Sequence, residues 1–168
     1  MKLTDKPYRP NVGIALFNAA GRVLIARRFK DDGPEIILPG LEWQMPQGGI
    51  DAHEDPRPAA ERELYEETGV TSIDYLGETT EWMTYDFPPY DGPPHRLSVF
   101  RGQRQKFFAF RFLGRESEII VADVRNDQPQ EFDAWRWEPL ANVPKLVVPF
   151  RREVYQKVAR EFARFAEA

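Results

Sequence analysis

The residues best suited to chemistry are three glutamates in one short segment. Glu63, Glu66 and Glu67 are spaced by three and four positions within the segment 48–70, GGIDAHEDPRPAAERELYEETGV. On an α-helix this spacing places the three carboxylates on one face. Each like-charged pair costs about 0.2–0.5 kcal/mol there, and a divalent cation would reverse the sign of that cost. The cluster therefore predicts a metal site.

A solvated acidic helix face is the alternative explanation, in which Arg62 offsets part of the repulsion. Two features of the preceding loop favour the metal site. Gly48 and Gly49 allow the backbone to approach closely, and Glu54 adds one more carboxylate before the helix.

The helix that must position these glutamates has a signal at each end. Asp55 can serve as the N-cap, Pro56 suits the first helical position, and Gly69 can adopt the left-handed conformation that ends a helix. Glu66 and Glu67 fall in the last turn, where the helix dipole favours cations. We therefore predict a short helix between Asp55 and Gly69.

The whole segment resembles the signature of the Nudix hydrolases. In that family the signature forms a loop–helix–loop that holds a divalent metal against a diphosphate linkage. His53 stands where the family usually has glycine, and we expect only a local change in the loop because that position is not a ligand. Nine signature positions are filled here: Gly48, Glu54, Arg62, Glu63, Leu64, Glu66, Glu67, Gly69 and Val70.

Composition describes an ordinary globular protein and excludes several classes. The 168 residues are one domain's worth, with 42% hydrophobic and 30% charged residues. The absence of cysteine excludes disulfides and thiolate metal sites. A net charge of −4 argues against a protein that tracks along duplex DNA, although it permits binding of one nucleic-acid end. The start, MKLTDKPYRP, lacks an apolar signal core and no run is long enough for a membrane span, so we expect a cytoplasmic protein without membrane contact.

The remaining elements are predicted from periodicity and from turn residues. Residues 86–96, DFPPYDGPPHR, contain too much proline for regular structure. Residues 150–165 form an amphipathic helix whose apolar stripe is core packing. These elements indicate an α/β fold: an α/β sandwich with a mixed sheet, in a single domain over residues 1–168. We predict strands over residues 12–16, 23–26, 43–47, 107–112, 119–122 and 131–137, and within residues 73–86.

The resemblance extends beyond the signature to a bacterial subgroup, the RNA pyrophosphohydrolases, also described as dinucleoside polyphosphate hydrolases. It implies the Nudix-type α/β/α sandwich. Residues 29–42 are longer than in some members and could form a distinct lip on the site. The segments that carry this resemblance are YRPNVG (8–13), WQMPQGG (43–49), GQRQK (102–106), EFDAWRW (131–137) and the run 148–154.

The resemblance also implies the metal chemistry. Magnesium prefers a few carboxylates together with phosphate oxygens, and it lowers the pKa of bound water. Manganese or another divalent ion could replace it. Glu131 is otherwise an ordinary glutamate at a strand start, but it matches an additional acidic residue of the subgroup. The implied ligands are Glu63, Glu66, Glu67 and Glu131, with Gly48, Glu54 and Arg62 orienting them. The general base stays open among the catalytic candidates Glu63, Glu67 and Glu131.

Substrate contacts follow from charge and from the resemblance. Arg9, Arg28 and Lys106 are candidates for phosphate contact. An exposed strand end is the alternative for the cluster that contains Arg28. His95 is most simply a surface residue, and Asp86 replaces a basic residue of some members, which removes one phosphate contact. The resemblance places base stacking at Phe150, with Val148 and Arg151 beside it.

Three functions remain open at this stage. The first is removal of pyrophosphate from RNA 5′ ends, which leaves a monophosphate. The second is hydrolysis of dinucleoside polyphosphates such as diadenosine tetraphosphate. The third is a nucleotide-binding or RNA-binding module without activity, which the complete set of carboxylates argues against. Sequence does not indicate the oligomeric state.

Overall fold

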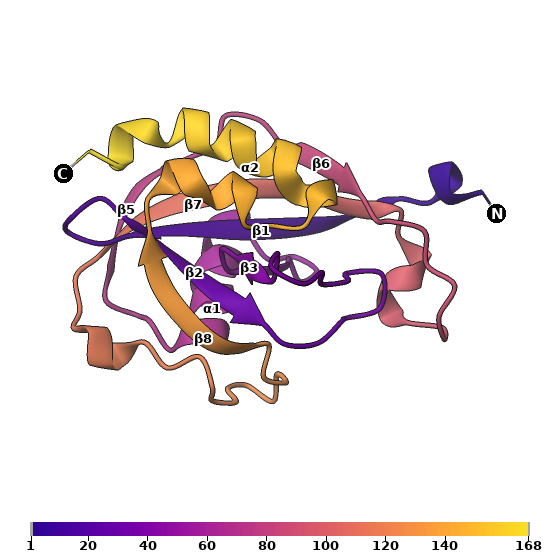
Figure 1. Ribbon diagram of the computed structural model, residues 1–168, viewed down its shortest axis with the longest axis horizontal. Coiled ribbons are helices and arrows are strands. Elements are labelled where there is room, and N and C mark those ends of the chain that lie inside the picture. Colours follow the sequence, from indigo (N-terminus) through magenta and orange to yellow (C-terminus); the bar gives the residue numbers. More distant parts are fainter. Residues whose placement is uncertain (1, 168) are drawn as a thin grey trace.

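A mixed β-sheet forms the centre of the molecule. The computed structural model describes residues 2–167 (Figure 1). In the main sheet the strands run in the order β3-β2-β1-β7-β5, while β4 pairs with β1, β6 with β7 and β8 with β2. The strands are β1 (Tyr8–Phe17), β2 (Val23–Arg28), β3 (Trp43–Gln44), β4 (Gln47–Gly49), β5 (Ile73–Glu78), β6 (Met83–Asp86), β7 (Gly102–Phe112) and β8 (Phe132–Glu138).

The parallel pair β1–β7 is the axis of this sheet, and every other strand pair is antiparallel. Its register begins with Tyr8 opposite Gly102 and ends with Phe17 opposite Arg111. Beside β1, the short strand β4 pairs Gly48 with Val12. The sheet therefore fixes Gly48 and Gly49 beside the first half of β1.

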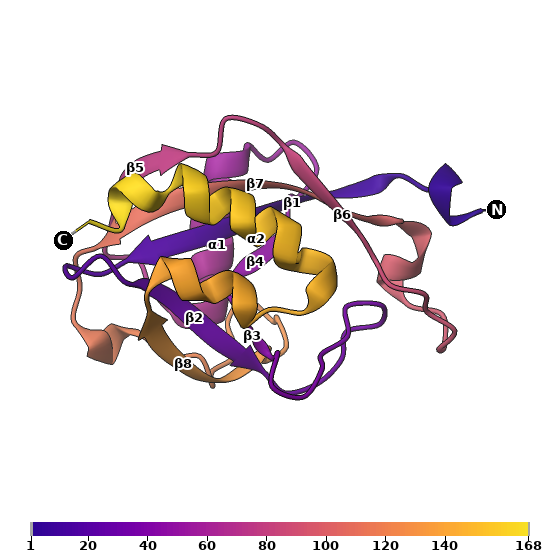
Figure 2. The same cartoon turned by 45° about the horizontal axis from the view of Figure 1, so that its top comes forward.

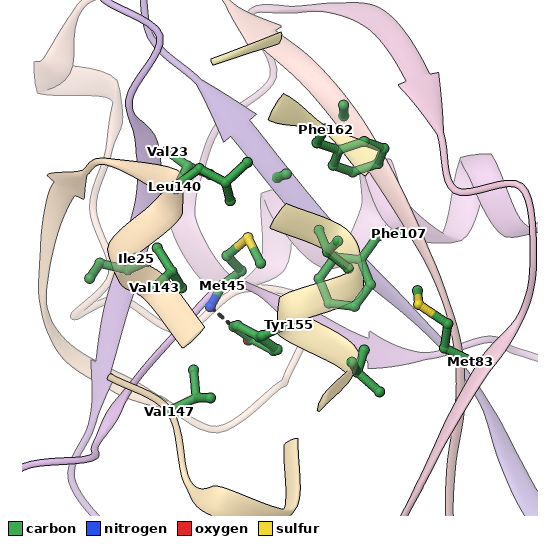
Figure 3. Close-up of a cluster of buried hydrophobic side chains, with 14 of the residues drawn as sticks. Val23, Ile25, Met45, Met83, Phe107, Leu140, Val143, Val147, Tyr155 and Phe162 are labelled. Atoms are coloured by element: carbon green, nitrogen blue, oxygen red, sulfur yellow. Dashed lines mark hydrogen bonds between the residues drawn. The ribbon is translucent and has the colours of Figure 1, made fainter. Parts of the chain in front are cut away.

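Two helices cover opposite faces of the sheet, as Figure 2 shows. Helix α1 (Pro56–Thr68) packs against one face, and α2 (Pro149–Glu161) covers the other. In Figure 3 the α2 side is an apolar cluster in which the Tyr155 hydroxyl accepts a hydrogen bond from the Met45 amide, 2.9 Å away. The predicted α/β/α sandwich with a mixed sheet is confirmed.

Helix α1 begins and ends at the predicted residues. Asp55 is its N-cap, although its side chain makes no capping hydrogen bond, and Pro56 is the first helical residue. Gly69 ends the helix at φ +79° and donates its amide to the Tyr65 carbonyl. The helix is held by a fully buried face formed by Ala59, Ala60 and Leu64.

Three element predictions need correction. Residues 43–47 form two strands, because the chain changes partner at Pro46, which cannot donate to a ladder. The regular part of the terminal helix ends at Glu161, and a 3-10 turn, η5 (Ala163–Phe165), follows.

The third correction concerns residues 119–122, which form no strand. The Ile120 amide donates to Thr68 at the end of α1, 2.9 Å away, and the side chains of Ile119 and Val121 are buried in the core on the α1 side of the sheet. Burial against a helix end therefore produced an alternation typical of a strand.

Within residues 2–167, every helix is too short or too polar to cross a bilayer.

Candidate active site

A polar cleft of about 290 Å³ opens where β1, β4 and α1 meet. Its cationic and anionic side chains are intermixed. Gly48 and Gly49 form part of one wall, and amides such as Asn11 and Gln103 line it as well. The charged residues that line the cleft are Arg9, Arg28, Arg96, Arg151, Asp32, Glu35, Glu63 and Glu131.

Arg62 ties the signature loop to the signature helix. Its Nε donates to Glu54 Oε2 at 2.8 Å, and its Nη1 donates to Glu63 Oε1 at 2.9 Å. Nη1 also lies 3.3 Å from Glu66, and Nη2 donates to the Gly49 carbonyl at 2.8 Å. The planar guanidinium of Arg62 therefore fixes the carboxylates of Glu63 and Glu66 relative to the Gly49 backbone, as its fork geometry allows.

Gly48 is required by close packing against Glu63. A Cβ atom built at residue 48 would lie 1.9 Å from the carboxyl carbon of Glu63. No side chain fits in that gap, so glycine brings the backbone next to the carboxylate.

Burial shapes the protonation of the carboxylates. It raises the pKa of Glu63 to about 7, against the lowering effect of Arg62. Burial and the nearby charges of Glu131 and Glu63 raise the pKa of Glu67 well above its ordinary value. Burial also raises the pKa of Glu131. The three groups therefore share one desolvated region and act on each other electrostatically.

The residues present fit a divalent cation. Glu67 is only 8% exposed, and its Oε2 atom has no hydrogen-bond partner within residues 2–167. Such an orphaned carboxylate oxygen is costly unless a cation neutralises it. Across that same range no three acidic or histidine side chains already converge on one point, and Arg62 donates to Glu63 and Glu66. Glu66 and Glu67 themselves are not among the cleft-lining residues.

Arg9 and Arg28 are the cations placed to meet an anion. Both line the cleft, Arg28 is 6% exposed, and burial lowers the pKa of each. Neither forms an ion pair with an acidic side chain in the described part of the chain. Arg28 donates instead to the Glu35 carbonyl, 2.7 Å away, and Arg9 Nη2 packs against Gly49. Partly desolvated, unpaired guanidinium groups suit phosphate oxygens.

The other predicted substrate residues are placed differently. Lys106 lies outside the cleft lining and pairs with Glu78, Nζ to Oε2, at 2.9 Å. Val148 and Phe150 are also absent from that lining, and Phe150 packs on the Tyr85 ring with 5.8 Å between centroids. Arg151 reaches the cleft, but its guanidinium is buried in an ion pair.

That ion pair involves Glu35, which sequence reasoning missed. Its Oε2 accepts from Arg151 Nη2 at 2.5 Å, and its Oε1 accepts from the Tyr85 hydroxyl and from Gln103 Nε2, the latter at 3.2 Å. Burial alone would raise the pKa of Glu35, but Arg151 and these donors hold it below its ordinary value. A lone glutamate within the apolar centre of residues 29–42 was the available signal.

Comparison with known proteins shows the family of the chain. A model of the NUDIX domain matches residues 7–158. The chain belongs to the Nudix family. Two curated Nudix relatives are named RNA pyrophosphohydrolase. The Acidiphilium cryptum protein is 51% identical, and the match covers 98% of this chain and 95% of the relative. The Afipia carboxidovorans protein is 52% identical, and the match covers 96% of this chain and 96% of the relative.

Solved structures show the same fold at low identity. The Escherichia coli dihydroneopterin triphosphate pyrophosphohydrolase superimposes with a TM-score of 0.63 at 16% identity, covering 92% of this chain and 97% of its own. The Caenorhabditis elegans Ap4A hydrolase binary complex gives 0.60 at 18% identity, covering 92% and 98%. The chain is thus a Nudix pyrophosphohydrolase, and Nudix hydrolases act with divalent metal ions.

Proposed function

We propose that the protein is an RNA pyrophosphohydrolase that uses Mg²⁺ to convert 5′-triphosphate or 5′-diphosphate ends of RNA to 5′-monophosphate ends. One observation carries the proposal: the unpaired guanidinium groups of Arg9 and Arg28 line the same cleft as Glu63 and Glu131. Curated relatives about half identical over nearly the whole chain bear that name. Because the proposed substrate is RNA, we expect the reaction to take place in the cytoplasm.

The proposed ligands are the four glutamates. Glu63, Glu66, Glu67 and Glu131 would hold Mg²⁺, and the Gly48 carbonyl could add a backbone oxygen. The bound ion neutralises phosphate oxygens and lowers the pKa of water.

The other side chains bind and orient. Arg62 and Glu54 are positioning residues that keep the Glu63 carboxylate directed at Gly48. Arg9 and Arg28 would contact the phosphate oxygens, which lowers the repulsion between the anhydride and an incoming water. The water adds to phosphorus and the anhydride P–O bond breaks, which releases pyrophosphate from a triphosphate end or phosphate from a diphosphate end. The proton of the water goes to a carboxylate among Glu63, Glu67 and Glu131.

Dinucleoside polyphosphates are the second candidate substrate, because they present the same phosphoanhydride chain to the same cleft. A direct competition separates the two. Purified protein with Mg²⁺ receives equimolar triphosphorylated RNA and diadenosine tetraphosphate, and both products are followed over time. We expect preferential release of pyrophosphate from the RNA. Preferential loss of the dinucleotide would overturn the first assignment.

Glu67→Gln tests whether the protein is an enzyme or only a binding module. The substitution keeps the shape of the side chain but removes the charge that a cation needs. We expect Mg²⁺-dependent turnover to fall by more than about a hundredfold, since even losses outside the ligand set cost about 10- to 100-fold. Circular dichroism and the unfolding midpoint should show a retained fold. Wild-type rates in this variant would restore the binding-module hypothesis.

A further inference from the structure

Residues 29–42 present two acidic side chains on one tight turn. Asp32 and Glu35 exchange backbone hydrogen bonds of 3.0 and 3.1 Å across Gly33 and Pro34. Gly33 has φ +59°, as a two-residue turn of this kind requires at its first position. Because Glu35 is anchored by its buried pair with Arg151, the position of Asp32 at the cleft is also fixed.

Asp32 connects this turn to the proline-rich loop across the cleft. Its Oδ2 accepts from Arg96 Nη2 at 2.6 Å, and its Oδ1 lies 3.0 Å from His95 Nε2. His95 Nδ1 accepts from the Leu97 amide, so Nε2 carries the proton that faces Asp32. Gly33 packs so closely that a Cβ atom there would lie 2.5 Å from the imidazole. We call this contact of Asp32 with His95 and Arg96 the Asp32 bridge.

The Asp32 bridge lies where two cavities meet. A second cavity of about 210 Å³ adjoins the main cleft and also contains Lys30. Asp32 and Arg96 line both cavities, and so do Arg28 and Glu131. A phosphate chain that extends from Glu131 into the second cavity would therefore pass the Asp32 bridge.

The two acidic contacts differ in exposure. The side chains of Glu35 and Arg151 are 5% and 3% exposed, whereas those of Asp32 and Arg96 are 37% and 57% exposed. A buried pair is costly to separate, while an exposed pair exchanges partners readily. The Glu35 pair is therefore a fixed anchor, and the Asp32 bridge is replaceable.

We propose that Arg96 is a polyphosphate-binding residue and that Asp32 is an internal anion which occupies it until the phosphate chain displaces the carboxylate. The inference rests on the proposed function, since it adds a contact to the same cleft. A chain with several phosphates outside the metal site displaces Asp32, because its oxygens replace both carboxylate contacts. A monophosphate product lacks those oxygens, so the Asp32 bridge re-forms and favours its release.

A double-mutant cycle on binding tests this without turnover. The probe is a methylene-bridged tripolyphosphate analogue with Mg²⁺, titrated by calorimetry. We expect Asp32→Asn to tighten binding about twofold to fivefold, because an exposed competing ion pair is worth about 0.4–1 kcal/mol. Arg96→Gln should weaken binding about tenfold or more, as loss of a charge-assisted contact does. In the Arg96→Gln background, Asp32→Asn should have a clearly smaller effect, because only its contact with His95 remains.

The Arg27–Asp133 pair is the matched control. Its Nε–Oδ1 distance is 2.8 Å, its side chains are 44% and 39% exposed, and neither residue lines either cavity. Arg27→Gln and Asp133→Asn should each change analogue binding by less than about twofold. An unchanged or weakened affinity in Asp32→Asn, or an equal effect of it in both backgrounds, would overturn the proposal. Analogue binding without hydrolysis of RNA would instead contradict the proposed function alone.

Discussion

Arg62 shows how much of the proposed metal site can depend on one side chain that is not itself a proposed ligand. Its guanidinium contacts Glu54, Glu63, Glu66 and the Gly49 carbonyl, all between 2.8 and 3.3 Å. Lysine carries the same charge but lacks the planar fork, so it cannot keep these contacts together. Replacing Arg62 by lysine therefore changes the geometry of the cluster while keeping its charge.

Arg62→Lys should raise the Mg²⁺ concentration needed for half-maximal turnover by about 10- to 100-fold, as loss of an orienting partner does. Turnover at saturating Mg²⁺ should fall less. The measurement is a Mg²⁺ titration of initial rates. Arg57→Lys on the same helix is the control, because Arg57 lies outside the cleft lining, where it pairs with Glu61 at 3.5 Å and stacks on the Tyr75 ring. A reduced maximal rate with an unchanged Mg²⁺ requirement would assign Arg62 to the substrate instead.

Gly48→Ala should lower turnover by about a hundredfold with a smaller effect on stability. The new methyl group must displace the Glu63 carboxylate, and a shift of about 1 Å at a reacting centre can cost a hundredfold. Gly40→Ala is the control: a Cβ there meets no atom within 4 Å, although its φ of +81° adds about 1–2 kcal/mol of strain. We expect Gly40→Ala to keep its activity, as measured by rate and by urea unfolding.

Sequence predicted the glutamate cluster and its place on a helix because both depend on local spacing. It could not show that Arg151 is paired with Glu35, since 116 positions separate them and only the tertiary fold brings them together. For the same reason Lys106 was an equal candidate with Arg9, although the structure pairs Lys106 with Glu78 outside the cleft lining. The ligand and substrate roles themselves stay predictions.

At the scale of elements, the turn containing Glu35 is held to α2 by a buried ion pair. Glu35→Gln would leave Arg151 buried with only a neutral partner. Removing one member of such a pair destabilises by about 3–5 kcal/mol. We expect a lower free energy of unfolding by about that amount at pH 7, measured in urea. The combined change Glu35→Gln with Arg151→Met should recover most of the loss, because no unpaired charge remains.

The same pair predicts the sign of a pH dependence. The pKa of Glu35 is lower in the folded protein than its ordinary value of 4.5, so its stabilisation is complete above that value. The stabilisation is lost as the pH falls through the lower, folded pKa. The stability difference between wild type and Glu35→Gln should therefore be constant near neutrality and shrink below about pH 4.5. A difference that grows on acidification would contradict the assignment.

Predictions of helices and strands succeeded where the sequence pattern depends on residues close by in the chain. Helix α1 has local end signals at Asp55, Pro56 and Gly69, and the structure begins and ends the helix there. These predictions failed where a partner distant in sequence determines the secondary structure. Residues 119–122 alternate like a strand but meet the end of α1, and the segment 43–47 is divided between two different strand partners.

At the scale of the whole molecule, the proposed metal site and the core are separate. Helix α1 is anchored by the fully buried side chains of Ala59, Ala60 and Leu64, which lie in the core on that side of the sheet. Chelation with EDTA should therefore abolish turnover and leave a cooperative unfolding transition. At Mg²⁺ tenfold above its dissociation constant, Tm should rise by only about 3–6 °C, measured by calorimetry. Loss of cooperativity in EDTA would show that the metal is structural.

The parallel pairing of β1 with β7 also bears on how the protein is made. The cleft draws Arg9 from the first strand, Gln103 from the seventh and Arg151 from the last helix. A ribosome must therefore release nearly the entire polypeptide before the pocket is complete. Chains that stop soon after the glutamate-rich helix accordingly contain Arg9 and Arg28 but lack Gln103, Glu131 and Arg151.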